Sequence, residues 1–125
     1  MLRLALLYSV VLVAYDTLAA FIAKAVGVSY NSFSLLVFVL LFFMGIFAGR
    51  KARSWVGLLP VAIAAAVEAT AGWYVASLIG PGYVPGWTTR ALAQMAIEST
   101  LLTFCAGAVG VWIGLGVARV RVSRP

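Results

Sequence analysis

The second apolar run of the chain, Phe33–Gly49, reads FSLLVFVLLFFMGIFAG. Inside it, Leu35–Met44 carry no polar side chain at all. Such a stretch is typical of a helix that faces lipid, because a helix needs about 20 mainly apolar residues to cross the hydrocarbon core of a bilayer. We therefore predict that this segment crosses a membrane.

The composition of the whole chain agrees with this interpretation. Of its 125 residues, 65% are hydrophobic and only 10% are charged, and the mean hydropathy is +1.12. A soluble domain usually carries about a quarter charged residues, with which it covers its surface. The length leaves room for about four spans of roughly 20 residues and for no soluble domain beside them.

Short polar or helix-breaking segments separate four apolar runs. We predict a single all-α domain over residues 1–125, an integral membrane bundle of four transmembrane helices at about 4–25, 33–49, 55–79 and 88–117. We expect antiparallel neighbours joined by short loops. The first run begins like a secretory signal, with Ala23-Lys24-Ala25 matching a cleavage motif, but we expect it to be retained as a span. The third run stops at Gly80-Pro81-Gly82, because proline and glycine break helices.

The basic residues indicate the direction of the helices. In a four-span arrangement Lys24 and Arg90 fall on one side, and seven basic residues fall on the other: Arg3, Arg50, Lys51, Arg53, Arg119, Arg121 and Arg124. Segments rich in lysine and arginine stay in the cytoplasm. We therefore predict cytoplasmic N- and C-termini, in the inner (cytoplasmic) membrane of a bacterium. Tyr30 and Trp87 lie near predicted boundaries and are interpreted as interfacial anchors.

Several classes of function are disfavoured. The net charge is +6, but the basic residues lie at the ends of apolar runs rather than in a stripe with aromatics, so we expect no nucleic-acid partner. The chain has one cysteine, Cys105, and no histidine, which removes the usual ligands of metal centres and the usual catalytic base. We see no nucleophile–base pair and no phosphate loop, and we expect no enzyme, no cofactor and no metal site.

The acidic residues are the most informative feature of the sequence. There are three, Asp16, Glu68 and Glu98, and all of them fall inside predicted spans. An ionisable side chain in the hydrocarbon costs at least a few kcal/mol, so it seldom persists without a partner or a task. At a helical rise of about 1.5 Å per residue, Glu68 lies near the middle of its span, and the other two lie further outward. The three carboxylates are therefore candidate proton- or cation-binding groups that can converge in one bundle.

The neighbours of these acids have two kinds of expected role. Candidates for close helix packing are the small residues Ala65, Ala69, Gly72, Ala106, Gly110 and Gly114, which let membrane helices approach one another. Candidates for polar or aromatic support of the acids are Ser9, Tyr15, Trp73, Tyr74, Arg90 and Gln94. In the fourth span Arg90, Gln94 and Glu98 recur every four residues, so they form one polar ridge.

Two interpretations of the carboxylates stay open. In the first, Asp16 and Glu68 bind protons or cations, Glu98 is a gate or relay, and the protein is a small transporter or channel. In the second, Glu98 pairs with Arg90 or Gln94, the other two acids bond to hydroxyls or to partner charges, and the protein is an accessory subunit of a larger membrane complex. Four helices of this length enclose little room, so we expect a homo-oligomer or a larger complex embedded in a lipid bilayer.

Overall fold

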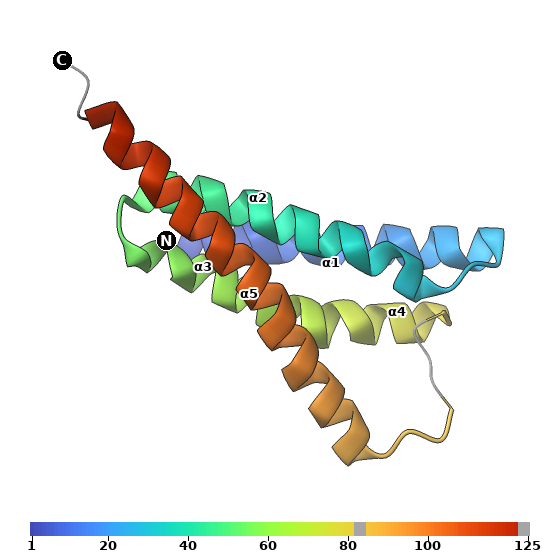
Figure 1. The fold of residues 1–125 in the computed structure, drawn as a ribbon. Helices are drawn as coiled ribbons and strands as arrows, with labels where there is room; N and C mark the ends of the chain where they lie inside the picture. The colour runs from blue at the N-terminus through green and yellow to red at the C-terminus, as the bar shows by residue number, and fades with distance from the viewer. Residues whose placement is uncertain (82–84, 123–125) are drawn as a thin grey trace.

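The computed structural model describes residues 1–81 and 85–122 of the chain. Its α-helices are α1 (Leu2–Val26), α2 (Ser34–Ala52), α3 (Leu58–Val67), α4 (Trp73–Ile79) and α5 (Thr89–Val122), as Figure 1 shows. Short 3-10 helices precede two of them, η1 (Tyr30–Phe33) before α2 and η2 (Trp55–Gly57) before α3. A π-helical turn, η3 (Glu68–Gly72), joins α3 to α4.

The helices form four continuous segments that are long and apolar enough to cross a membrane: Leu2–Val26, Tyr30–Ala52, Trp55–Ile79 and Thr89–Arg119. This confirms the prediction of an all-helical protein with four such helices. Two helices run beyond their predicted ends, α2 to Ala52 and α5 to Val122. The basic residues there continue the helix because lysine and arginine are good helix formers.

The outer surface of the bundle is apolar. Leu35 is 72% exposed, Phe43 is 62% exposed and Leu78 is 70% exposed. A protein in water rarely exposes large contiguous apolar areas, so this surface indicates a membrane protein. The described basic side chains lie towards helix ends, and Arg124 lies outside the described residues.

The most extensive helix packing is between α2 and α5, which run in the same direction. Gly45 lies against Gly107 and Gly49 lies against Val111, so residue numbers rise together along both helices. Four glycines of this contact have a backbone oxygen of the opposite helix where a Cβ atom would be: Gly45, Gly49, Gly110 and Gly114. Ala106, on the same helix as Gly110, is half-buried. The backbones approach this closely only because these positions carry no side chain.

The second parallel pair is α1 with the third span. α1 packs along α3, η3 and α4, and near their ends the Lys24 amine donates a 3.0 Å hydrogen bond to the Ile79 carbonyl. Sequence neighbours such as α1 and α2 do run in opposite directions (Figure 1), but these two helices make little contact with each other. The most extensive packing is therefore between alternate, parallel helices. The antiparallel neighbours α3 and α5 also pack against each other, with the Val61 side chain against Gly107.

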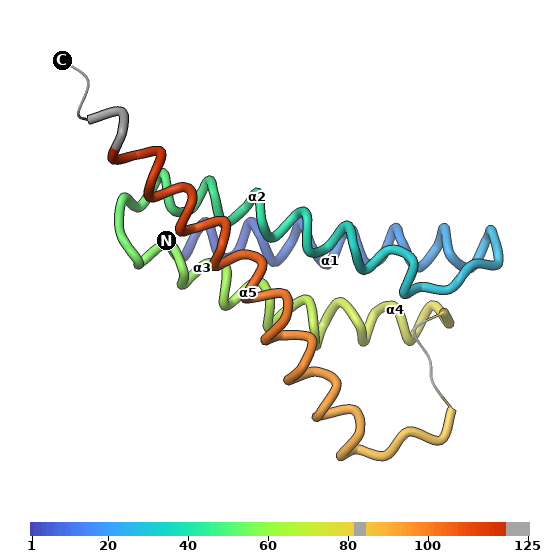
Figure 2. The backbone as a smooth tube through the Cα atoms, viewed as in Figure 1, coloured from blue at the N-terminus to red at the C-terminus, as the bar shows by residue number. Residues whose placement is uncertain are grey.

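The core lies between these two pairs. Among the largest fully buried side chains are Leu12 and Val61 from α1 and α3, and Leu41 and Val111 from α2 and α5. Figure 2 shows that α5 crosses the other helices obliquely, so that its first turns stand away from α4. The bundle is consequently tight around these four side chains and more open towards the start of α5.

Candidate functional site

Asp16 is a buried carboxylate inside the bundle. It lies one helical turn after Leu12 on α1 and is 1% exposed. Its Oδ1 accepts a 2.8 Å hydrogen bond from the Tyr30 hydroxyl. Its Oδ2 has no hydrogen-bond partner among the described residues and lies against Gly72, in the space that a Cβ atom would need. The absence of a side chain at Gly72 therefore makes room for the carboxylate between α1 and η3.

Glu68 begins the π-helical turn in the middle of the third span. The amide of Trp73 donates a hydrogen bond to the Glu68 carbonyl, five residues back rather than four. A π-helical turn holds one residue more than an α-helical turn, and such turns are frequent at functional sites. Gly72 ends the same turn. The same π-helical turn thus carries both Gly72, which makes room for Asp16, and the second carboxylate, Glu68.

A cavity of about 370 Å³ adjoins Glu68. Three aromatic residues line it, Tyr30, Trp73 and Trp87, and Glu68 is the charged residue among its described lining residues. Smaller polar side chains complete the wall: Ser29, Asn31, Ser34 and Ser99. Glu68 Oε2 is buried and has no hydrogen-bond partner within the part of the chain that the structure describes. The cavity therefore has a mixed wall of aromatic rings and small polar side chains, with one carboxylate.

Tyr30 connects the cavity to Asp16. Its ring lines the cavity, and its hydroxyl bonds to the Asp16 carboxylate. Asp16, Tyr30 and Glu68 are called the carboxylate cluster below. Within residues 1–81 and 85–119, no lysine or arginine forms an ion pair with either carboxylate of the cluster. The nearby Lys24 amine instead bonds to the Ile79 carbonyl.

Glu98 lies further out than the cluster. A groove of about 300 Å³ between α2 and α5 is lined by both Glu68 and Glu98. The Glu98 side chain is exposed, and its Oε1 accepts a 2.8 Å hydrogen bond from Gln94 Nε2. Arg90, one turn before Gln94 on the same helix, is also exposed. The structure thus brings Asp16 and Glu68 together in the interior and leaves Glu98 at the rim, bonded within its own helix.

The other residues that the sequence singled out have varied positions. The Tyr15 hydroxyl donates a 2.8 Å hydrogen bond to the Phe33 carbonyl, so it holds the end of η1 rather than a carboxylate. Tyr74 is 60% exposed and is not among the described residues that line the cavity. Ser9 is half-buried, and its buried Oγ has no hydrogen-bond partner in residues 1–81 and 85–119. Ala65 and Ala69 are buried in the helix contacts of the third span.

The sequence interpretation missed Tyr30 and Trp87 as site residues. Both looked like interfacial anchors because they stand next to apolar runs. The available signal was the polar group around Tyr30, where Ser29, Asn31 and Ser34 gather between two spans. In the structure all four side chains line the cavity.

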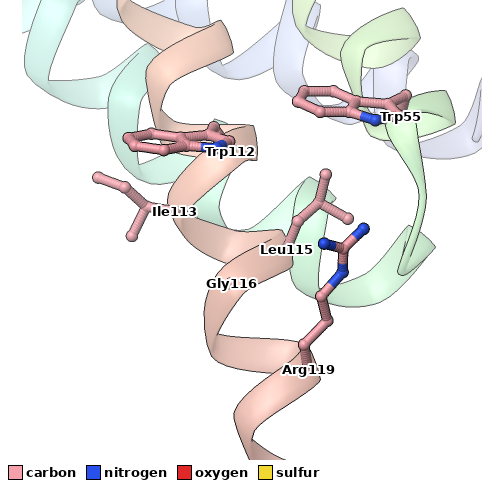
Figure 3. A pocket seen from close by; sticks show the side chains of 6 residues that line it. All are labelled: Trp55, Trp112, Ile113, Leu115, Gly116 and Arg119. Carbon is pink, nitrogen blue, oxygen red and sulfur yellow. The ribbon is translucent and has the colours of Figure 1, made fainter.

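A second hollow, of about 300 Å³, lies at the other end of the bundle. Figure 3 shows Trp55 and Trp112 on opposite sides of it, with Leu115 and the Arg119 guanidinium between them. The described lining residues include no acid, and Arg119 gives the hollow a positive charge. This hollow is therefore not suited to a cation.

The carboxylate cluster is chemically suited to bind a positive charge, because unpaired carboxylate oxygens in an apolar bundle attract protons and cations. No protein-family model, curated protein or solved structure matches the chain. Its function is therefore inferred from the geometry of the cluster and of the adjoining cavity.

Proposed function

We propose that this protein moves protons or cations across a membrane, with Asp16 and Glu68 as the binding carboxylates. The observation that carries the proposal is a buried Asp16 and a half-buried Glu68 with a buried Oε2, neither of which has an ion-pair partner in the described part of the chain. An unpaired buried charge costs several kcal/mol. A bound proton or cation removes that cost, and its release restores the charge, which is the cycle that transport needs.

The three acids suggest an order of binding along one route. Glu98 stands at the rim of the groove, Glu68 lies where the groove meets the cavity, and Asp16 lies behind Tyr30. A cation that enters along the groove meets Glu98 first, which fits a role as gate or relay. The Tyr30 hydroxyl then links the cavity to Asp16. With cytoplasmic termini in a bacterial inner membrane, the cavity opens on the outer half of the bilayer.

The route does not continue as an open pore through one bundle. The fully buried Leu12, Leu41, Val61 and Val111 pack across the interior next to the cluster. Ions do not cross such an apolar layer without water or polar groups. Transport therefore requires either a rearrangement of the helices or a route between copies, and a carrier fits better than a permanently open channel.

A second candidate function is an accessory subunit of a larger membrane complex. It is favoured by the exposed polar ridge of α5, where Arg90, Gln94 and Glu98 all face outward. Polar groups on an apolar helix are costly in lipid and generally face protein or water. A partner helix over this ridge satisfies them.

Flux in proteoliposomes tests the proposal. Wild-type protein is expected to dissipate an imposed proton or cation gradient, whereas Asp16→Asn and Glu68→Gln are expected to lose this activity. The free energy of unfolding of both variants should stay within about 1 kcal/mol of wild type, because no ion-pair partner is left unpaired; breaking a buried ion pair typically costs about 3–5 kcal/mol.

Glu98→Gln is the matched control, since Gln94 still offers it a hydrogen bond, and its effect should be the mildest of the three. Stable variants with wild-type flux would contradict transport. Variants that fail to assemble, or that lose a co-purifying membrane partner, would favour the accessory subunit.

A further inference from the structure

The wall of the cavity limits the kind of cation that fits. We infer that the cavity beside Glu68 binds an organic cation with an apolar body, such as a quaternary ammonium ion, and not a bare metal ion. This inference rests on the proposed function and names the substrate class of that same site. Three features of the cavity support it: its volume, its single charge and its aromatic rings.

The volume of the cavity is that of a small-molecule site. Ligand pockets in proteins have about 300–1,000 Å³, and this cavity has about 370 Å³. One water molecule takes about 30 Å³ of the liquid, so a bare or partly hydrated metal ion would leave most of the space unfilled. A tetraalkylammonium ion with short chains fills much more of it.

The charge and the ligand set also disfavour a metal ion. Glu68 is the one carboxylate among the described lining residues of the cavity, so it balances a single positive charge. A hard divalent cation such as Ca²⁺ takes six to eight oxygen ligands, several of them carboxylates. In the described ranges, no group of three acidic or cysteine side chains is placed to hold a metal ion.

The aromatic rings supply what an organic cation needs. Cations bind over aromatic faces within about 6 Å, and aromatic cages recognise quaternary ammonium groups in this way. The π-helical turn helps to place one of these rings beside Glu68. The Trp73 amide donates a hydrogen bond to the Glu68 carbonyl, and both side chains line the cavity. In an uninterrupted α-helix, Gly72 would take the position above Glu68. The extra residue thus directs Gly72 towards Asp16 and an aromatic ring towards the cavity.

The groove between α2 and α5 offers an entrance for a cation that partitions into lipid. Val37, Phe38 and Leu102 line it, and it shares Ser34, Glu68, Met95 and Ser99 with the cavity. A cation with an apolar body can therefore pass along these apolar side chains, from Glu98 at the rim until its charge meets Glu68.

Calorimetric titration of the full chain in lipid nanodiscs with tetrapropylammonium tests the inference. Binding to wild type is expected, and excess Na⁺ or K⁺ should not displace it. Glu68→Gln should abolish binding. Trp73→Leu should weaken it about 5- to 30-fold, the equivalent of one desolvated cation–π contact, and Trp73→Phe should keep part of the affinity. Trp112→Leu, in the second hollow, is the control and should bind like wild type.

The outcomes separate this inference from the proposed function. Displacement of tetrapropylammonium by Na⁺ or K⁺, or equal affinities of wild type and both Trp73 variants, would overturn the inference. Proton or metal-ion flux that depends on Asp16 and Glu68, with no tetrapropylammonium binding, would also overturn it but leave the proposed function standing. Tetrapropylammonium binding that requires Glu68 and Trp73 supports the inference, even if no flux is found and transport fails.

Discussion

Asp16 Oδ2 occupies the space that a Cβ atom at Gly72 would need, so the carboxylate of the first helix fits against the backbone of the third span. The other oxygen of Asp16 is held by the Tyr30 hydroxyl at 2.8 Å. Gly72 therefore does more than let two helices approach. It provides the space for a buried acid beside the π-helical turn that carries Glu68.

This contact predicts a coupled effect of two substitutions. Gly72→Ala should lower the free energy of unfolding by about 1–3 kcal/mol, because the new methyl group overpacks the site against Asp16. This loss should appear although alanine has the higher helix propensity, by about 1 kcal/mol. In an Asp16→Ala background, Gly72→Ala should cost much less than in the wild-type background, because the carboxylate that the methyl group meets is gone. Unfolding in mixed micelles measures both variants.

Gly116→Ala is the control for this pair, because a Cβ added there would meet no described atom within 4 Å outside its own turn of α5. It should be neutral or slightly stabilising. If Gly72→Ala costs the same with and without the Asp16 carboxylate, the contact is not the cause of the effect.

Removing the Tyr30 hydroxyl should lower the free energy of unfolding more than removing the Tyr15 hydroxyl. Tyr30→Phe removes the hydrogen bond to Asp16, and Tyr15→Phe removes an equally short one to the Phe33 carbonyl. A hydrogen bond to a charged group contributes about 1.5–3 kcal/mol, against about 0.5–1.5 kcal/mol for a neutral pair. With Asp16 ionised, Tyr30→Phe is expected to cost more, and the difference should vanish in an Asp16→Asn background. Equal costs in the wild-type background would show that Asp16 is not charged there.

The contact between α2 and α5 should tolerate no side chain at Gly110. A Cβ atom there would meet the Phe42 carbonyl and, at 3.0 Å, the Ile46 amide nitrogen, both of which are backbone atoms. Gly110→Leu is therefore expected to force the two helices apart and to lower the thermal stability or change the size of the purified particle. Gly116→Leu should have a much smaller effect. Wild-type stability and size for Gly110→Leu would refute the contact.

The seven-to-two distribution of basic residues predicts the topology. In a Cys105→Ala background, cysteines placed at Ser54 and at Ser123, which lies outside the described residues, should be labelled only from the cytoplasm. A cysteine at Pro85 should be labelled only from outside. Labelling of Ser54 and Pro85 from the same side would contradict four spans.

The four helices could be predicted from the sequence because each apolar run is long and is ended by glycine, proline or charged residues. Which helices pack against each other could not be predicted from the sequence. The small residues Gly110 and Gly114 mark a contact face, but nothing in a single helix indicates that this face meets α2, which runs parallel to it.

The site was predicted in part for a similar reason. The acids stand out because they interrupt apolar runs. The π-helical turn at Glu68 could not be recognised in the sequence. The residues Glu-Ala-Thr-Ala-Gly are compatible with an ordinary α-helix, and the extra residue in the turn depends on tertiary packing. Tyr30 lies at a helix end, and only the path of η1 shows that its hydroxyl reaches Asp16.

The central claim is that Asp16 and Glu68 exchange protons or cations inside the bundle, and infrared difference spectroscopy of the protein in bilayers tests it most directly. Spectra recorded between two pH values should contain carboxyl bands that shift in heavy water. One band should be missing from Asp16→Asn and another from Glu68→Gln, while Glu98→Gln keeps both. If neither carboxyl changes its protonation or its cation binding over the whole pH range in which the protein stays folded, the claim is contradicted.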